Sequence, residues 1–492
     1  MVYARVLRPP SHGAKLKSFD SSALDRLKGF QVIRGGELVA VLHRCPDEAE
    51  KALAKLNAEY HIPSPRFDDK TVFDYFINNA DQGTVEESAG NLESGQKLAK
   101  EVVEKTYFDS YVAHAAIETH SALAYFEGDK LTVWASTQTP FALQRALARD
   151  LDMPSENVRV ITPFVGGGFG GKYDNLQAIQ VVKIAKIAGK PVQLVWSRED
   201  EFFFDKFRPA AVVEVRSGIK ADGRIVLWDY IIHGMGDRGA TLFYDIPHNR
   251  TTVHRQLRNG ERQHLLRTGF WRGPDNNTNS FARESHIDVM AARAKMDPLE
   301  FRFENLSDVR MGGVLKAGAE KFRWTSAKVP SGRGFGIACG IHWDVRVALF
   351  AEVDVNERTG RVKVKRVVCA QDLGLVINPA GARLQVEGCI TMGLGYVLSE
   401  EVRFQGGRVL HLNFDTYELP RFSWVPKIET ILLETDPSRP LGCGEPPIIC
   451  MGAVVANAVY DATGVRLLQL PMTPKRVKEA LAARPKAAAS VS

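Results

Sequence analysis

Five glycines among the six residues Gly166 to Gly171 constrain this chain more than any other feature of its sequence. They follow an apolar segment that ends near Ile161 and precede an amphipathic segment that begins near Asp174, so they join a predicted strand to a predicted helix. Consecutive glycines leave backbone N–H groups open to a ligand at the positive end of a helix. The alternative is a tight turn, but such a turn needs only one or two glycines. We therefore predict a loop that holds a ligand against its backbone.

Two phosphate-binding motifs fit this loop only in part. Gly166, Gly168 and Gly171 match G-x-G-x-x-G, but the acidic residue that a dinucleotide-binding unit places about 20 positions later is absent. The pair Gly171-Lys172 resembles the end of a P-loop, but Tyr173 stands where Ser or Thr would bind magnesium. A nicotinamide-binding module therefore stays an alternative.

The composition is that of a globular protein rather than a nucleic-acid-binding or membrane-spanning one. The 492 residues suffice for roughly two to four domains. The net charge of +6 is spread along the chain, which favours an anionic small ligand or an acidic partner over nucleic acid. No run approaches the roughly 18 apolar residues of a membrane span, and the start lacks the features of a signal peptide. We expect a cytoplasmic protein, or a periplasmic one if a partner chain carries the export signal.

Metal ligation by this chain is not expected. The six cysteines lie far apart and form no C-x-x-C, so they predict neither a zinc site nor an iron-sulfur cluster: Cys45, Cys339, Cys369, Cys389, Cys443 and Cys450. The spacing of His114, Glu118 and His120 would suit a metal, but we expect these residues to be structural.

Periodicity and turn residues divide the chain into segments. Residues 1–60 predict a small α+β unit, with a helix that Pro46 opens. Residues 61–105 are polar and weakly periodic, which is typical of a linker. Alternating strands and helices then predict one α+β domain over 106–325 and another over 326–483, with a linker at 326–334 and a disordered tail at 484–492.

Several separate segments resemble one family. The glycine loop is similar to the signature loop of the molybdenum-cofactor-binding large subunits of the xanthine oxidase family. Other segments follow in family order, namely His114-Ala-Ala-Ile-Glu118, Trp134-Ala-Ser-Thr-Gln138, Arg272-Gly-Pro274, Gln385-Val-Glu-Gly388 and Gly444-Glu-Pro446. The resemblance spans nearly the whole chain. It implies a hammerhead-like N-terminal α/β unit followed by two mixed α+β molybdenum-cofactor-binding domains.

Two longer matches resemble the branch that contains isoquinoline 1-oxidoreductase and related aldehyde dehydrogenases. They are Trp196-Ser-Arg-Glu-Asp-Glu-Phe202 and Asn457-Ala-Val-Tyr-Asp-Ala-Thr-Gly464. Lys172 departs from this branch, which usually has arginines after the glycine loop, and looks like the xanthine-oxidase version. Purine oxidisers place a substrate-binding Glu after that Lys, where this chain has Tyr173. The expected substrate is therefore an aldehyde or an N-heteroaromatic compound rather than a purine.

The resemblance implies a role for each matching residue. Molybdenum would be held by a pterin dithiolene, in the cytosine dinucleotide form, with no protein side chain on the metal. Gln138 would hydrogen-bond the oxo ligand, supported by the backbone of Phe169 and Gly170; the alternative is a solvated residue near a helix start. The residues expected to contact the cofactor are Gly166, Gly167, Gly168, Phe169, Gly170, Gly171, Gln385, Gly388, Gly393 and Gly444.

Glu445 is the expected general base, because Gly444 before it and two prolines after it fix a carboxylate on a rigid loop. A solvated loop Glu is the alternative. Arg272 would stabilise the negative charge that develops on the substrate, and its alternative is an ordinary ion pair with Glu284.

The scattered cysteines imply that electrons leave through other chains. Relatives use a small iron-sulfur subunit, with a cytochrome or flavin subunit as a further member in some. This chain also lacks the segment carrying Met-Gly-Gln-Gly that the isoquinoline branch places before the small α+β unit, so we expect a second chain to supply it. The alternative to a catalytic subunit is a degenerate subunit without cofactor.

Overall fold

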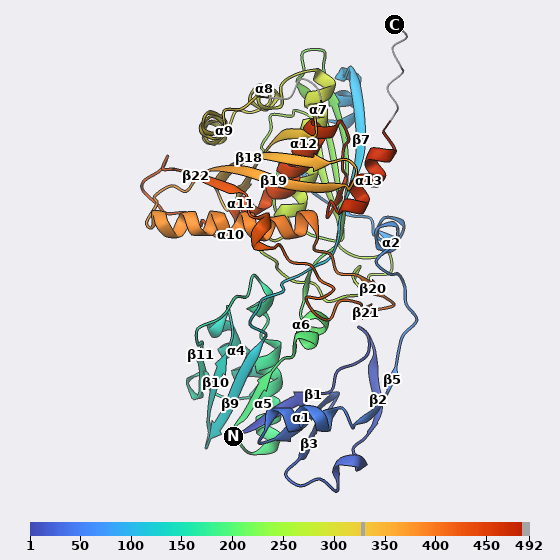
Figure 1. The fold of residues 1–492 in the computed structure, drawn as a ribbon, viewed down its shortest axis with the longest axis vertical. Coiled ribbons are helices and arrows are strands. Elements are labelled where there is room, and N and C mark those ends of the chain that lie inside the picture. The colour runs from blue at the N-terminus through green and yellow to red at the C-terminus, as the bar shows by residue number, and fades with distance from the viewer. Residues whose placement is uncertain (326–329, 485–492) are drawn as a thin grey trace.

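The computed structural model describes residues 1–325 and 330–484, and this part of the chain forms two bodies along one long axis (Figure 1). Residues 326–329 of the expected linker at 326–334 and residues 485–492 of the expected tail at 484–492 lie outside the described residues, and β17 already begins at Arg333. No described helix combines the length and apolar character needed to cross a membrane.

The lower body in Figure 1 is built on a seven-stranded mixed sheet. Its strand order is β11 (Val158–Ile161), β10 (Lys130–Ala135), β9 (Ser121–Glu127), β12 (Val192–Val195), β1 (Val2–Val6), β4 (Leu38–His43) and β3 (Gln31–Gly35). The helices of this body are α1 (Pro46–Leu53), α4 (Pro140–Leu151) and α5 (Leu176–Ala188). Alternation along β4 explains the layering, since Ala40 and Leu42 pack with the α4 and α5 side while Val39 and Val41 pack with α1.

The sheet of the lower body corrects one expectation. The predicted unit over residues 1–60 does not stand apart, because β1 pairs in parallel with β12 through the register Val2 to Val192 and Ala4 to Leu194. An edge strand with free backbone groups needs such a partner, and the sequence does not reveal which distant strand provides it. Residues 1–60 and the segment from β9 to β12 therefore share one core.

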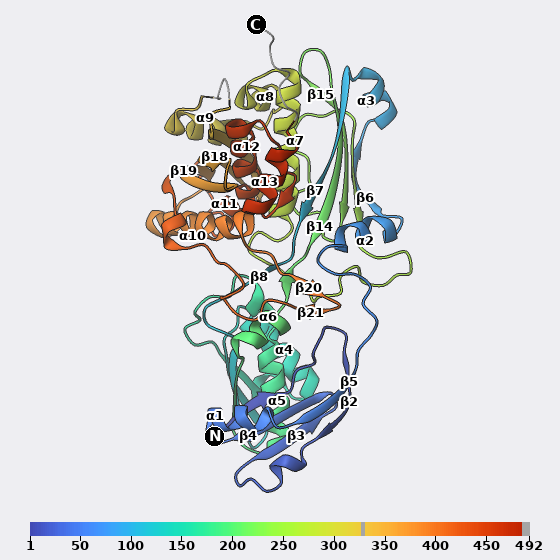
Figure 2. The same ribbon diagram turned by 45° about the vertical axis from the view of Figure 1, so that its right-hand side comes forward.

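The upper body contains two sheets with helices between them (Figure 2). The six-stranded sheet has the order β23 (Gln469–Leu470), β7 (Glu101–Asp109), β14 (Ala211–Ile219), β15 (Ile225–His233), β16 (Asn249–His254) and β6 (Thr84–Ala89). The four-stranded sheet has the order β17 (Arg333–His342), β18 (Val345–Asn356), β19 (Arg361–Asp372) and β22 (Lys427–Leu433).

The long buried helix α7 (Asn276–Ala294) and the apolar helix α12 (Met451–Thr463) fill the space between these sheets. A glycine in β17 permits this packing, because a Cβ at Gly336 would overlap the backbone of Val454. The remaining helices of the upper body are α2 (Val72–Asn79), α3 (Leu92–Leu98), α8 (Pro298–Glu304), α9 (Val309–Phe322), α10 (Pro379–Leu398), α11 (Pro446–Ile449) and α13 (Pro474–Ala482).

Three short strand pairs and one helix complete the described elements. The pairs are β2 (Lys15–Asp20) with β5 (Asn57–His61), β8 (Val112–Ala113) with β13 (Phe207–Arg208), and β20 (Phe404–Gln405) with β21 (Arg408–Val409). The helix α6 (Arg198–Phe204) begins with a capping box in which Ser197 and Asp200 exchange hydrogen bonds.

The predicted linker over 61–105 is wrong as a description of local structure. This stretch contains α2, β6, α3 and the start of β7, and its strands belong to the six-stranded sheet. The sequence signal is weak because β6 is an edge strand with mostly exposed side chains and α2 buries only Val72 and Phe76.

Candidate functional site

The glycine loop follows β11 and lies close to the segment that precedes α7. A Cβ at Gly170 would overlap the carbonyl oxygen of Phe270, and Gly170 has a φ of +115°. The loop continues as a 3₁₀ turn over Gly171–Tyr173, so α5 begins at Leu176, two residues later than the expected Asp174. Within the described residues, the N–H groups of Gly167, Gly168 and Phe169 have no acceptor.

Gln138 lies against this loop, just before α4. Its Oε1 accepts the N–H of Gly170 at 3.1 Å, and its own N–H donates to the carbonyl of Lys172 at 2.9 Å. A Cβ at Gly168 would overlap the same Oε1. Because Oε1 is turned to the loop, the Nε2 of Gln138 remains as a donor, and no acceptor contacts it in the described part of the chain. The N–H of Gly170 donates to Gln138, so the support of the cofactor by the Phe169 and Gly170 backbone stays a prediction.

Arg272 joins three segments of the site. Its N–H donates to the carbonyl of Phe169 at 3.0 Å, its Nε to the carbonyl of Gly444 at 2.7 Å, and its Nη2 to Oε1 of Gln385 at 2.9 Å. Its Nη1 has no acceptor among the described residues and faces Gly388, where a Cβ would lie 3.4 Å away.

The alternative interpretation of Arg272, an ion pair with Glu284, is wrong. Glu284 is fully buried, and its carboxylate contacts Arg302 at 3.1 Å and Arg283 at 3.2 Å. Arg272 is therefore held by neutral acceptors, which leaves its positive charge for another partner.

Glu445 lies directly before α11 and faces the same space as Arg272. Its Oε1 accepts the N–H of Gly273 at 3.2 Å, and its Oε2 accepts a hydrogen bond from Nε2 of His342 at 2.8 Å. Burial alone raises the pKa of this carboxyl. The hydrogen bonds from His342 and Gly273, with the nearby charge of Arg272, outweigh burial and hold the pKa below its usual value. Glu445 is therefore ionised at neutral pH, as a general base must be.

His342 was not among the residues predicted for the site. This buried residue ends β17, and its Nδ1 accepts a hydrogen bond from Nδ2 of Asn276 at 3.1 Å. That contact places the ring proton on Nε2, which donates to Glu445. His342 precedes Glu445 by 103 positions, and the packing of α11 against β17 and β18 brings the two residues together. A histidine at the end of a predicted strand gives no signal by itself.

These residues surround one cavity of about 550 Å³. It is lined by Gln138, Phe169, Gly170, Tyr173, Phe270, Trp271, Arg272, Pro274, Leu384, Gln385, Gly388, Gly444 and Glu445. The loop glycines Gly166, Gly167, Gly168 and Gly171 lie behind this lining and pack against Glu118, Gln138, His114 and Asp205. The cavity is thus formed by side chains and backbone from five separate parts of the chain.

Gly393 does not lie in this cavity. It is buried on α10, and a Cβ there would meet the side chain of Met451 at 2.6 Å. It lies five positions after Gly388, which corresponds to about 7.5 Å along a helix and places the two glycines on different faces of α10. Gly393 permits close packing between α10 and the start of α12, so its expected cofactor contact is not supported by its position.

The lining fits a molybdenum-pterin cofactor in its donors and its space. The amide Nε2 of Gln138 and the N–H of Phe169 are donors without acceptors among the described residues, and they suit the oxygen-rich surface of such a group. Gly388 and Gly444 leave space on the opposite side of the cavity. A side chain at either position would approach Arg272 or Gln385 and reduce that space.

Two buried histidines support the glycine loop from beneath. His114 donates to Asp205 at 2.9 Å and to the carbonyl of Phe270 at 2.6 Å; His120 donates to Glu201 at 3.0 Å and to the carbonyl of Gly171 at 3.1 Å. Burial alone lowers the pKa of each imidazole, but the carboxylates and carbonyls raise both above the ordinary value. His120, Glu201 and Asp205 are close enough to share a metal ion, but each is already engaged in these pairs.

We expect stability to fall as the pH rises through the raised pKa values of His114 and His120. A histidine whose pKa is raised by folding stabilises the folded state while it is protonated. This stabilisation is complete below the unfolded-state pKa of about 6.5 and is lost as the pH rises through the folded-state pKa. Thermal unfolding measured between pH 6 and 9 tests this. His114→Gln should lower Tm most at pH 6 and flatten the pH dependence. An unchanged slope would contradict the assignment, and His61→Gln, at an exposed position on β5, is the control.

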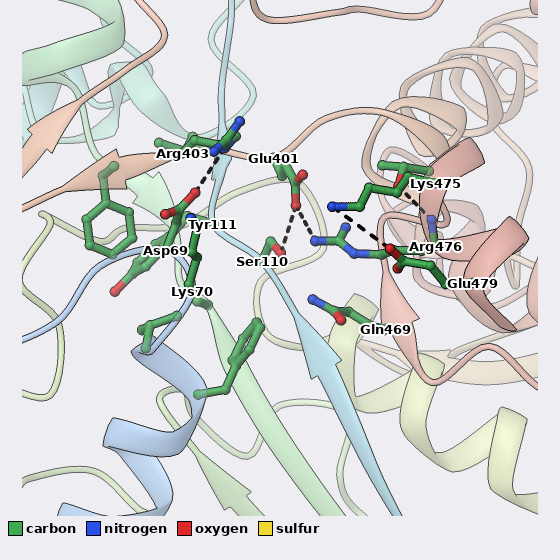
Figure 3. A pocket seen from close by; sticks show the side chains of 16 residues that line it. Asp69, Lys70, Ser110, Tyr111, Glu401, Arg403, Gln469, Lys475, Arg476 and Glu479 are labelled. Carbon is green, nitrogen blue, oxygen red and sulfur yellow. Dashed lines mark hydrogen bonds and ion pairs between the residues drawn. The ribbon is translucent and has the colours of Figure 1, made fainter. Parts of the chain in front are cut away.

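A second cavity, of about 400 Å³, lies between α2, β20 and α13 (Figure 3). Its charged side chains pair with one another, since Arg403 contacts Asp69 at 3.0 Å and Arg476 contacts Glu401 at 2.8 Å. None of the predicted site residues lines it. Because most of its charged side chains are already paired, this cavity carries no argument for a ligand.

Comparisons with known proteins identify a family for this chain. Two models, both described as molybdopterin cofactor-binding domain, match residues 76–306 and 314–426. A nicotinate dehydrogenase subunit of Pseudomonas putida is 30% identical over 98% of this chain. The beta subunit of isoquinoline 1-oxidoreductase from Brevundimonas diminuta is 28% identical over 96% of it. The chain spans 44% and 64% of the lengths of these relatives, respectively.

A solved structure shares the fold. Quinoline 2-oxidoreductase from Pseudomonas putida 86 superposes with a TM-score of 0.85, covering 98% of this chain and 95% of that one at 16% identity. The mixed sheets of this chain therefore have the same arrangement as those of the quinoline 2-oxidoreductase chain, and the two relatives above are named as subunits. The chain belongs to the molybdopterin-binding large subunits of the xanthine oxidase, or molybdenum hydroxylase, family.

Proposed function

We propose that this chain is the catalytic subunit of a molybdenum hydroxylase that oxidises an aldehyde or an N-heteroaromatic carbon. The observation that supports this most is the convergence of Gln138, Arg272 and Glu445 on one cavity, although 307 positions separate the first from the last. A solvated loop glutamate would not accept hydrogen bonds from a buried histidine and a backbone N–H.

Each of these residues has a role that its contacts permit. Glu445 accepts a proton on its carboxylate from the water-derived nucleophile, and His342 and Gly273 hold that carboxylate in place. Arg272 presents Nη1 to the oxygen or ring nitrogen of the substrate where negative charge develops. Gln138 orients the cofactor by donating from Nε2.

The cofactor that we propose is a molybdenum-pterin in the cytosine dinucleotide form. When bound, it supplies the two-electron oxidation with water-derived oxygen. The glycine loop, Gln385, Gly388 and Gly444 would hold it through backbone and amide groups.

The lining of the cavity favours an aromatic aldehyde or a fused N-heterocycle over a polar purine. Tyr173 and Phe270 meet edge to face at 5.4 Å, and Trp271 lines the same space with its Nε1 bonded to the carbonyl of Ala113 at 3.2 Å. Such a wall offers ring faces and few additional hydrogen-bonding groups. The names of the two relatives, for nicotinate and isoquinoline, support an N-heteroaromatic compound as one substrate class.

We infer that partner chains complete the enzyme. Large apolar side chains are exposed on segments around the site, including Phe164 on the glycine loop, Phe141 on α4 and Leu384 on α10. Exposed apolar groups of this size favour a covering chain. The partners that we propose are a second chain carrying Met-Gly-Gln-Gly and a small iron-sulfur subunit, with a cytochrome or flavin subunit as a further member.

The decisive experiment measures molybdenum and turnover in the same preparations. The chain should be expressed alone and with its genomic neighbours, and assayed with benzaldehyde, isoquinoline, nicotinate and xanthine and an artificial electron acceptor. We expect about one molybdenum per chain and turnover of an aldehyde or heterocycle only with the partners. A preference for xanthine would contradict the substrate argument. Protein without molybdenum in every preparation would favour the degenerate, cofactor-free subunit.

A further inference from the structure

Arg238 packs on Phe270, a ring that lines the cofactor cavity, and lies outside the group of residues assigned above. It follows β15, and its guanidinium carbon is 4.9 Å from the centre of the Phe270 ring and 5.6 Å from that of Trp343. Phe270 lines the cavity together with Arg272 and Glu445, and Trp343 follows His342, which bonds Glu445. Arg238 therefore lies between a ring of the cavity wall and the hairpin tip beside the general base.

The charge of Arg238 is not neutralised by a carboxylate. Among the described residues, no Asp or Glu oxygen lies within 4.0 Å of its guanidinium nitrogens, and the residue is exposed. Its neighbour Asp237 is paired with Arg255 at 2.9 Å. Asp275 is the other nearby acid, and burial raises its pKa although the charge of Arg238 lowers it. A guanidinium stacked on rings leaves its in-plane N–H groups available for a planar anion.

The hairpin tip that carries Trp343 is held in one conformation. Trp343 and Asp344 have φ values of +52° and +78°, which non-glycine residues rarely adopt. The carboxylate of Asp344 contacts Arg310, Arg346 and Arg439, and these contacts fix the turn. Trp343 nevertheless remains 70% exposed, so the turn presents a fixed indole ring to solvent beside Arg238.

We propose that Arg238 binds a carboxylate on the substrate, and that Phe270 and Trp343 orient the guanidinium for this contact. The inference rests on the proposed function and makes it more specific. The preferred substrates are aromatic aldehydes or N-heteroaromatic compounds that carry a carboxylate on the ring. Arg272 contacts the substrate oxygen or ring nitrogen next to the reacting carbon, and Arg238 contacts the carboxylate at the opposite end of the substrate.

Matched substrate pairs test this in the loaded enzyme. The pairs are 4-formylbenzoate with its methyl ester, and nicotinate with nicotinamide. Arg238→Gln should raise KM for the carboxylates by about 10- to 100-fold, the effect of one charge-assisted contact, and change kcat little. KM for the neutral members should stay unchanged. Arg238→Lys keeps the charge without the planar fork and should recover part of the effect.

Arg255→Gln is the matched control, because Arg255 is a neighbouring arginine that is already paired with Glu86 and Asp237. Equilibrium dialysis of terephthalate gives a readout without turnover, and its affinity should fall in Arg238→Gln but not in Arg255→Gln. Equal effects of Arg238→Gln on charged and neutral substrates would overturn the proposal while leaving the proposed function intact. Absence of turnover with all four compounds in molybdenum-loaded protein would instead overturn the proposed function.

Discussion

Replacement of Glu445 by Gln is expected to lower kcat by about 100- to 10,000-fold, the contribution of a general base, while the molybdenum content stays unchanged. The substitution keeps the size of the side chain, and its single amide oxygen can still accept from either His342 or Gly273, although the carboxylate accepts from both. It removes the negative charge that these contacts stabilise, and an amide cannot take up the proton. Cofactor content by metal analysis and turnover with an artificial acceptor, measured on the same protein, separate the two effects.

Glu401→Gln is the control for this experiment. Glu401 is also a half-buried carboxylate with a short contact to a cation, Arg476 at 2.8 Å, but it lines the second cavity of Figure 3. We expect normal turnover from it. If Glu445→Gln retained full activity with bound molybdenum, the carboxylate would be a structural partner of His342. If it lost the metal, Glu445 would belong to the cofactor-binding wall.

The sequence was informative where a local pattern and a site coincide. The glycine run, the Gly-Glu-Pro-Pro segment and the Arg-Gly-Pro segment each restrict the backbone, and the structure brings Gly170, Glu445 and Arg272 to one cavity. The helix expected near Asp174 after the glycine run is α5, which begins at Leu176, and the helix that Pro46 was expected to open is α1.

What the sequence did not predict depends on contacts between distant segments. His342 acts through Asn276 and Glu445, which lie 66 positions before it and 103 after it. The pairing of β1 with β12 joins residues about 190 positions apart. The edge strand β6 lacks alternation because most of its side chains are exposed, so residues 61–105 resembled a linker. In each case a distant segment of the chain determines the local structure or role, and no local sequence pattern identifies that segment.

The loop itself is the most sensitive part of the site, and Gly170→Ala is expected to abolish cofactor binding. A Cβ at this position would overlap the carbonyl of Phe270, and the backbone holds a φ of +115° that alanine rarely adopts. Strain of about 3 kcal/mol corresponds to about a 100-fold loss of affinity. The loop cannot relieve it locally, since moving Gly170 breaks the hydrogen bond to Gln138 and moving Phe270 disturbs its contact with His114.

Gly442→Ala provides the comparison. Gly442 lies in the segment that leads to Glu445, but a Cβ there meets no atom of the described chain within 4 Å, and its φ lies outside the glycine-favouring range. We expect Gly442→Ala to bind molybdenum normally and Gly170→Ala to be folded but free of metal, as judged by circular dichroism and metal analysis. A Gly170→Ala protein that kept its molybdenum would mean that the loop and the Phe270 segment can separate without loss. The close backbone contact between them would then be incidental, and the cofactor would have to depend mainly on α10 and the segment around Gly444.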